Sequence, residues 1–347
     1  MGKVSTRLAL EKRLNKLIKD DEKYYIFIDE VQRIKKFEEA IASVRVSFNC
    51  SLFVIGSNSK MLHGKMQDRL TGRAKEFEIY PFTYNETLEY KKANNIKILE
   101  NEFENFIEYG GMPQRFEEVD ENGIREYLLG LYYSIIDKDV YFVHKKISKK
   151  DFMNISKYII STTGKTFSAL SIAKYLKNSL PSDEQKKFSE TVNNYAKYLE
   201  ECYFIMECKP YYLKGKEALN GTKKYYAIDS GLRNALENII ELDDTFALEG
   251  IIYNELLYRG YEVRYGKMID GEIDFVVIKG KKKCLIQVAY SVDTEKAYNR
   301  EYGAFDKIND YSPKYVMTLD KKDTSTKGIT HINIIDFLTN KVDINLS

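Results

Sequence analysis

The sequence of 347 residues has few of the residues that form disulfide bridges or zinc sites, and it has no long hydrophobic run. Its four cysteines are scattered without C-x-x-C spacing, and only three histidines could join them, so we expect reduced, buried thiols. No apolar run reaches the roughly 18 residues that span a bilayer, and the N-terminus lacks the apolar core of a signal peptide. We therefore expect a cytoplasmic protein without a membrane partner.

The chain also lacks an excess of charge of either sign, because 54 Lys and Arg residues nearly balance 52 Asp and Glu residues. This balance neither requires nor excludes nucleic acid as a partner, so any basic surface must be local. The length is sufficient for two or three domains of ordinary size. We therefore expect several hydrophobic cores.

A phosphate-binding P-loop is missing as well, although one segment is typical of P-loop ATPases. Residues 24–34 read YYIFIDEVQRI, an apolar run that ends in Asp29 and Glu30. This is the pattern of a Walker B strand, which is a buried parallel strand. One acid at its end holds Mg²⁺ through water, and the next polarises the attacking water. The pattern G-x-x-x-x-G-K-[ST] occurs nowhere: residues 164–166 read GKT, but residue 159 is isoleucine.

The surroundings of this strand predict a parallel α/β unit. Residues 4–20 and 34–48 have apolar residues at helical spacing, and residues 52–55 form a second apolar strand. Strand, helix and strand in this order predict a parallel sheet, whose ligand lies beyond the carboxyl ends of the strands. The acids of the Walker B strand, together with Ser57 and Asn58, fall at those ends.

The rest of the chain shows three changes of pattern. Residues 81–148 are mainly helical, with a YGGMPQRF break, and we expect a helical lid. Residues 149–233 contain three helical segments, the third from Glu190, and two short strands, which is the layout of a winged helix. Residues 234–347 begin with a helix and continue in strands.

Several phrases of the sequence resemble a family of bacterial and archaeal AAA+-like ATPases whose ATPase module is followed by a region of unknown function. These phrases are YYIFIDEVQRI, VIGSNSKML, LTGRAKEFEIYPFTYNE, YGGMPQRF, KYYAIDSGLRNAL, GEIDFVV and LIQVAYS. The resemblance covers nearly the whole chain from about residue 10. It implies an α/β protein with a partial ATPase sheet (1–80), a helical lid (81–148), a winged helix (149–233) and a domain like the PD-(D/E)XK nucleases (234–347).

The resemblance implies that the intact family uses ATP and Mg²⁺. Asp29 would hold Mg²⁺ and Glu30 would orient the attacking water. Asn58, with Ser57, would be the polar sensor of the γ-phosphate. Arg73 would meet the charge that builds on that phosphate.

The ATPase module of this chain departs from the pattern of the family. Arg69 is a weaker candidate for the role of Arg73, and the P-loop that cradles the phosphates in the family is absent here. We expect the chain alone to bind and hydrolyse ATP weakly or not at all. A truncated or frameshifted gene, or a deliberately shortened chain, would explain the absence.

The nuclease-like domain is predicted to have an incomplete site. A PD-(D/E)XK site needs an acid on one strand, Glu or Gln and then Lys two residues apart on the next, and often a helical Glu, which together hold a metal ion. Asp274 and Gln287 fit the strands, and Glu249 or Glu255 could be the helical acid. Ala289 stands where the lysine is expected. We therefore expect a docking or DNA-positioning domain, with a degenerate Mg²⁺-dependent nuclease as an alternative.

The winged-helix segment has two interpretations. Lys186, Lys187 and Lys197 surround the predicted recognition helix, and lysines of such a helix contact DNA phosphates. Glu190 and Glu200 dilute this basic face, so a protein partner is the other interpretation. The main prediction is an ATP-dependent switch in the intact family that acts with DNA or a protein, and a catalytically silent binding module is an alternative.

Overall fold

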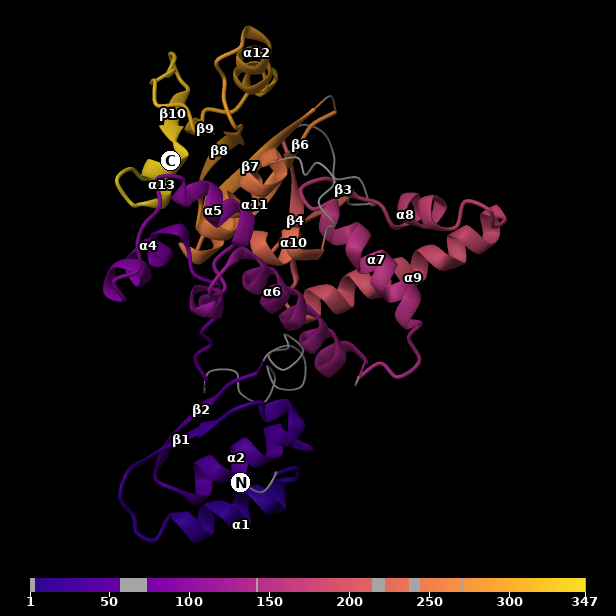
Figure 1. Cartoon of the computed structure of the whole chain (residues 1–347), viewed down its shortest axis with the longest axis vertical. Helices are drawn as coiled ribbons and strands as arrows, with labels where there is room; N and C mark the ends of the chain where they lie inside the picture. The colour runs from indigo at the N-terminus through magenta and orange to yellow at the C-terminus, as the bar shows by residue number, and fades with distance from the viewer. Residues whose placement is uncertain are drawn as a thin grey trace. The chain divides into compact units, whose positions relative to one another are not determined.

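The computed structural model describes residues 4–56, 74–141, 143–213, 222–236, 244–269 and 271–346. The chain forms two compact units (Figure 1). The first holds Met1–Glu78 and Glu201–Tyr203, and the second holds Ile79–Glu200 and Phe204–Ser347. None of the helices in the described ranges combines the length and apolar character that crossing a membrane requires.

The N-terminal unit contains the predicted parallel α/β unit. Its elements are α1 (Arg7–Leu17), β1 (Tyr24–Ile28), η1 (Val31–Arg33), α2 (Phe37–Ser47) and β2 (Cys50–Val54). β1 and β2 are parallel, with Ile26 opposite Leu52, so the prediction of strand, helix and parallel strand is confirmed. Leu10 and Leu14 of α1 and Ile41 of α2 pack against the strands in one hydrophobic core.

The strands of this unit are buried on one face only, whereas the sequence predicted a buried Walker B strand. Both helices pack on the side of Ile26 and Leu52. On the other side, Tyr25 and Phe27 expose 64% and 68% of their surface, and the ring of Phe27 stacks on Phe53 at 4.8 Å. Since successive residues of a strand point to opposite faces, covering one face leaves these aromatic rings open.

The second unit begins with helices, as the sequence predicted. They are α4 (Tyr84–Ala93), α5 (Glu102–Tyr109), η3 (Pro113–Glu117), α6 (Glu121–Ile135) and η4 (Ile136–Tyr141). A capping box fixes the start of α4, because the Thr83 side chain accepts from the Glu86 amide at 3.2 Å while the Glu86 carboxylate accepts from the Thr83 amide at 2.9 Å.

The next part of the second unit consists of three helices and three strands. They are α7 (Lys149–Ser161), β3 (Thr166–Phe167), α8 (Ala169–Leu176), α9 (Ser182–Glu201), β4 (Ile205–Tyr212) and β5 (Lys223–Ala227). β5 pairs with both β3 and β4 in antiparallel fashion. α9 begins eight residues before the predicted start at Glu190, because its first turns are polar and exposed and give no apolar period.

The remaining elements complete an eight-stranded mixed sheet. They are α10 (Ser230–Leu236), α11 (Asp244–Tyr258), β6 (Glu262–Lys267), β7 (Glu272–Lys279), β8 (Lys282–Val288), α12 (Glu295–Gly303), η5 (Phe305–Lys307), β9 (Lys314–Thr318), β10 (Thr330–Asn333) and α13 (Ile334–Leu338). The strand order is β10-β9-β8-β7-β6-β4-β5-β3. β6, β7 and β8 are antiparallel, β9 is parallel to β8, and β4 is parallel to β6.

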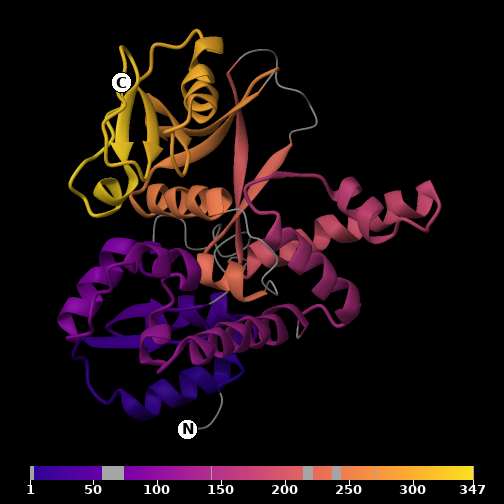
Figure 2. The ribbon, with the colours of Figure 1, turned by 45° about the horizontal axis from the view of Figure 1, so that its top comes forward.

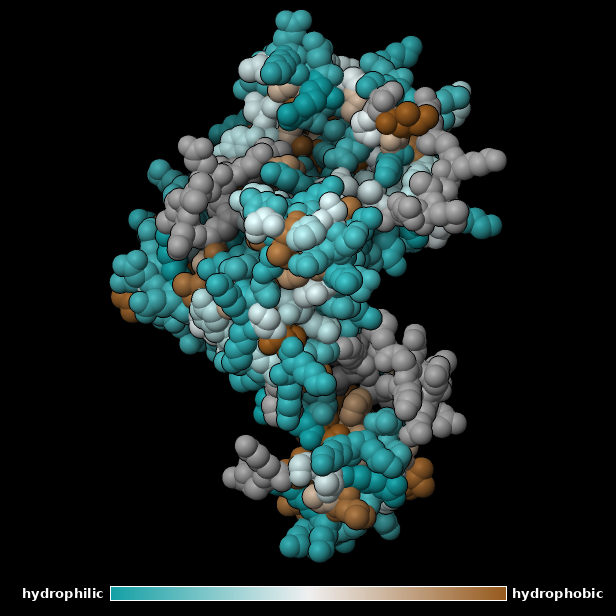
Figure 3. All heavy atoms as spheres, turned by 90° about the vertical axis from the view of Figure 1, so that its right-hand side faces the viewer, coloured by the Kyte–Doolittle hydropathy of each residue, from teal (hydrophilic) through white to brown (hydrophobic). Residues whose placement is uncertain are grey.

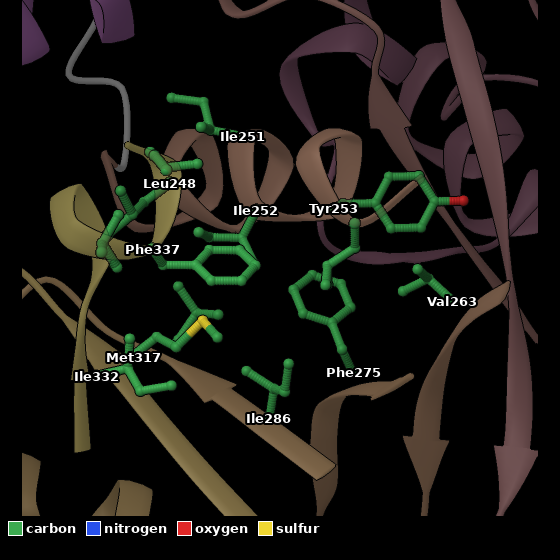
Figure 4. Packing of buried hydrophobic residues seen from close by; sticks show 14 of the residues in the cluster. Leu248, Ile251, Ile252, Tyr253, Val263, Phe275, Ile286, Met317, Ile332 and Phe337 are labelled. Carbon is green, nitrogen blue, oxygen red and sulfur yellow. The ribbon is translucent and has the colours of Figure 1, made fainter. Parts of the chain in front are cut away.

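Helices cover both faces of this sheet. α11 and α13 pack on one face, where Ile252 and Phe337 lie against Phe275 and Met317 (Figures 2 and 4). α12 and η5 contribute to the hydrophobic cluster that includes Ala289 on the other face. The sheet is therefore the middle layer of three.

The molecular face in Figure 3 is mostly hydrophilic, with scattered hydrophobic residues.

Three phrases of the sequence meet at Asp229, which is buried. The Gly111 amide donates to Asp229 Oδ2 at 2.6 Å, and the Leu232 amide donates to its Oδ1 at 2.9 Å. The Phe82 amide donates to the Gly111 carbonyl at 2.9 Å. YPFTYNE, YGGMPQRF and KYYAIDSGLRNAL thus form one junction between the first helices and β5.

Substitution of Gly111 by alanine should destabilise the second unit. A Cβ atom at this position would overlap the carbonyl oxygen of Phe82, so backbone must move, and we expect a loss of about 3 kcal/mol in the free energy of unfolding. Urea denaturation followed by circular dichroism measures it. The control is Gly130→Ala in α6, where the space is open and a gain of about 1 kcal/mol is expected. Equal stability of Gly111→Ala and the wild type would contradict the tight contact.

Candidate functional site

The two acids predicted for the ATPase site lie directly after β1. The Ile55 amide donates to the Ile28 carbonyl at 2.9 Å, and the Val31 amide donates to the Ile55 carbonyl at 3.2 Å, which holds the ends of the two strands together. Glu30 has a φ of 50°, in the left-handed region. This conformation is rare for a residue with a side chain and is often found at functional sites.

The side chains of the two acids differ in their surroundings. Asp29 is exposed, and its Oδ1 accepts from the Glu30 amide at 2.9 Å. The Glu30 carboxylate accepts a short hydrogen bond from Gln32 and lies 3.8 Å from the guanidinium of Arg33. Asp29 is thus open to a cation, whereas Glu30 is held in place. The other predicted residues, Ser57, Asn58, Arg69 and Arg73, lie outside the described residues.

A second group of predicted residues comes together in the sheet of the second unit. The Asp274 amide donates to Gln287 Oε1 at 2.7 Å, and the Val288 amide donates to Asp274 Oδ2 at 2.8 Å. Glu249 of α11 accepts from the Tyr226 hydroxyl at 3.1 Å. All three predicted side chains are buried. The structure therefore gathers residues that are far apart in the sequence.

The alternative helical acid, Glu255, has a different environment. Its carboxylate is 2.7 Å from Arg259 Nε, in an ion pair within α11. It lines a small cavity of about 40 Å³ together with Tyr80 and Asn254. Such a volume suits one or a few water molecules. Of these two acids of α11, Glu249 is the one that interacts with the charge of Asp274.

The sequence did not reveal the lysine of this cluster. Lys224 of β5 exposes only 2% of its side chain, and its Nζ is 2.6 Å from Glu272 Oε1. Burial lowers the pKa of Lys224, but the carboxylates of Glu249, Glu272 and Asp274 outweigh burial, so the pKa is raised. The sequence pattern of such a site places the lysine at position 289, where Ala289 is buried in an apolar cluster. Lys224 lies within residues 149–233, which the sequence predicted to form a winged helix, so no local pattern linked it to these acids.

The acids of the cluster are shifted towards their neutral forms. Burial raises the pKa of Asp274 to about 7, against the opposing effects of Lys224 and the Val288 amide. Burial also raises the pKa of Glu249 well above its ordinary value, and the charge of Asp274 adds to this shift. Perturbed groups of this kind mark candidate functional sites.

The set of atoms around Asp274 leaves few free oxygen ligands for a metal ion. Gln287 uses Oε1 for the Asp274 amide and donates from Nε2 to Glu301 Oε2 at 2.9 Å. Among the residues that the structure describes, no three His, Cys, Asp or Glu side chains form a group suited to a metal ion. Asp274, Gln287 and Glu249 as metal ligands remain a prediction, and the cluster already contains the cation of Lys224.

Comparison with known proteins adds to the sequence and the geometry. Residues 3–88 match the model of an AAA domain. The N-terminal unit contains an AAA-like domain. Residues 100–243 match a domain of unknown function (DUF8612). The AAA-like domain indicates an ATPase-related function, and domains of this type use ATP and Mg²⁺.

Two relatives resemble the chain over most of its length. An uncharacterized protein from Haemophilus influenzae is 29% identical over 327 residues, which are 93% of this chain and 79% of that protein. An uncharacterized protein from Methanocaldococcus jannaschii is 29% identical over 303 residues, which are 81% of this chain and 64% of that protein. The chain thus spans less than two thirds of the second relative.

Stability should depend on pH through Asp274. The folded protein keeps the proton of this carboxyl up to a pH of about 7, whereas the unfolded chain releases it near a pH of about 4. The folded state therefore binds more protons between these values, and the free energy of unfolding falls as the pH rises through them. In Asp274→Asn the change of the free energy of unfolding with pH should lose the contribution of about one bound proton. Urea denaturation from pH 4 to 8 measures this change. An unchanged dependence would contradict the raised pKa.

Proposed function

We propose that this protein is part of an ATP-dependent switch whose nucleotide-responsive part is the AAA-like domain, and that the chain alone hydrolyses ATP weakly or not at all. The observation that carries this proposal is the position of Asp29 and Glu30 at the carboxyl end of a parallel strand, within the residues that match the AAA domain. Ligands of parallel α/β sheets bind at that end.

The side chains of this site suit the chemistry of the proposal. Bound Mg²⁺ would neutralise charge on the phosphates of ATP. Exposed Asp29 would hold that ion through water, and Glu30, fixed by Gln32 and Arg33, would orient the attacking water. Asn58, with Ser57, would sense the γ-phosphate, and Arg73 would stabilise the charge that develops there; these three roles are proposed from the sequence alone.

Weak activity follows from the missing phosphate contacts. The chain contains no G-x-x-x-x-G-K-[ST] motif, so it lacks the backbone amides and lysine that cradle phosphates.

Nucleotide turnover tests this proposal. The purified chain should release no phosphate from ATP above the rate of its Glu30→Gln variant, and it should not bind a fluorescent ATP analogue in the micromolar range. A second protein, in which a strand and P-loop of an AAA domain precede residue 4, should bind Mg²⁺-ATP, and Asp29→Ala should reduce its turnover by about 100-fold. The proposal would be contradicted if the unextended chain hydrolysed ATP. It would also be contradicted if Asp29→Ala left the turnover rate of the extended protein unchanged.

DNA binding by the second unit is a further candidate function. The order of elements α7, β3, α8, α9, β4 and β5, with β5 between β3 and β4, supports a winged helix. α8 and the first half of α9 extend away from the sheet (Figure 1). Lys186, Lys187 and Lys197 of α9 are exposed, where they could contact phosphates.

Charge reversal on α9 tests DNA binding. The double variant Lys186→Glu/Lys187→Glu should weaken binding of duplex DNA by about tenfold or more and lower the salt dependence of the affinity, because two phosphate contacts are lost. Fluorescence anisotropy at several salt concentrations measures both. The matched control is Lys321→Glu/Lys322→Glu, an exposed pair outside α9. Equal losses in both variants, or no DNA binding by the wild type, would favour a protein partner instead.

A further inference from the structure

A buried group of charges joins three elements of the second unit. Lys224 lies on β5, Glu249 on α11, and Glu272 and Asp274 on β7. Glu249 and Asp274 expose 5% and 8% of their surface. The Lys224 ammonium contacts Glu272 and interacts electrostatically with Glu249 and Asp274, and we call these four residues the Lys224 cluster.

We propose that the ammonium group of Lys224 takes the place of a divalent cation in this cluster, so that the acids of the nuclease-like domain form a site that holds together without metal. The proposal concerns the second unit and goes beyond the ATPase-related function. It also gives a reason why Asp274, Gln287 and Glu249 are present without a lysine at position 289.

The contacts of the cluster carry this proposal. The Lys224 ammonium has three N–H donors and no acceptor, and it lies 2.6 Å from the Glu272 carboxylate at the edge of the cluster. The side chain of Lys224 is 2% exposed, so its charge is buried, whereas the side chain of Glu272 is 42% exposed. An ammonium that approaches buried carboxylates offsets their charge as a bound cation would.

One oxygen of each buried acid also accepts a hydrogen bond from a donor of the protein. Asp274 Oδ2 accepts from the Val288 amide, and Glu249 Oε2 accepts from the Tyr226 hydroxyl. Mg²⁺ requires a nearly octahedral set of oxygen ligands at about 2.1 Å and usually keeps several waters. A buried set of oxygens that already accept hydrogen bonds suits an ammonium ion better than such a hydrated ion.

The absence of a lysine at position 289 fits the same arrangement. Ala289 is 1% exposed and packs with Leu285, Val292 and other apolar residues, so a lysine there would have to bury its charge in a hydrophobic cluster. The lysine that the structure brings to the acids comes instead from β5. It serves as their counter-ion and is not available, as a separate group, to activate water beside a metal ion.

Thermal unfolding of the full chain in millimolar Mn²⁺ and in EDTA tests the proposal. All proteins carry Asp29→Ala, so that the magnesium site proposed for the AAA-like domain cannot contribute. With Lys224 present, the melting temperatures in Mn²⁺ and EDTA should agree. At pH 8, above the raised pKa of Asp274, Lys224→Met should melt lower in EDTA and regain on the order of 5 °C in Mn²⁺. Mn²⁺ at about 100 times its dissociation constant then supplies the positive charge that the ionised carboxylate has lost.

Two control variants keep this test specific. Lys224→Arg retains the positive charge and should remain insensitive to Mn²⁺. Lys283→Met removes a lysine of β8 whose Nζ lies 2.6 Å from the Asp310 carboxylate. This variant should not become sensitive to Mn²⁺. A Mn²⁺ response of Lys283→Met equal to that of Lys224→Met, or no response of folded Lys224→Met, overturns the proposal.

Direct measurement of bound Mn²⁺ decides the case in which Lys224→Met does not fold. Electron paramagnetic resonance of the Asp29→Ala protein should show only free Mn²⁺. Bound Mn²⁺ that disappears in the additional variant Asp274→Asn would overturn the proposal, because the cluster would then hold a metal ion beside Lys224. Neither result depends on nucleotide binding, so this test and that of the ATPase-related function fail independently.

Discussion

The parallel pairing of β4 with β6 determines the arrangement of the second unit. Lys209 of β4 lies opposite Arg264 of β6, and the pairing continues to Tyr212 and Lys267. It joins the strands of residues 149–233 to those of residues 234–347 in one sheet. Through it, β5 and β7 lie close enough for Lys224 to reach Glu272. A site that the sequence assigned to one domain is therefore built from two segments.

Burial of charge is the main energetic cost of this arrangement. Buried carboxylates are stabilised only where partners compensate for the loss of water, and an incompletely compensated group takes up a proton. Lys224, Tyr226 and the Val288 amide supply partners to Glu249 and Asp274. The raised pKa of Asp274 shows that this compensation is partial. A buried cluster with this cost is therefore weak evidence for stability.

In the AAA-like domain, the pairing of two neighbouring strands positions the acids. The carboxyl ends of β1 and β2 meet at one edge, and the hydrogen bonds of Ile55 and Val31 keep Glu30 in a left-handed conformation beside exposed Asp29. Backbone amides cradle the phosphates in P-loop ATPases, and the sequence contains no G-x-x-x-x-G-K-[ST] motif that would supply them. The acids of the AAA-like domain and the Lys224 cluster are thus separate sites, and each can be tested without the other.

Local patterns in the sequence determined much of the fold. The apolar run before Asp29, the helical period of α2 and the run of β2 predicted a parallel unit, because these signals lie within a few residues of one another. The same pattern placed Asp274 and Gln287 on neighbouring strands. Period alone did not predict the early start of α9, whose first turns are exposed, or the open face of β1, which depends on what packs against it.

Tertiary structure alone decided the surroundings of the acids. The sequence identified Asp274, Gln287 and Glu249 and showed that position 289 lacks a lysine, since these facts depend on residue type and spacing. That Lys224 stands beside them follows from the β4–β6 pairing, which joins residues distant in the chain. The sequence therefore determined which acids this protein has, and the folded sheet decided which cation accompanies them, because strand pairing at long range leaves no mark in local sequence periodicity.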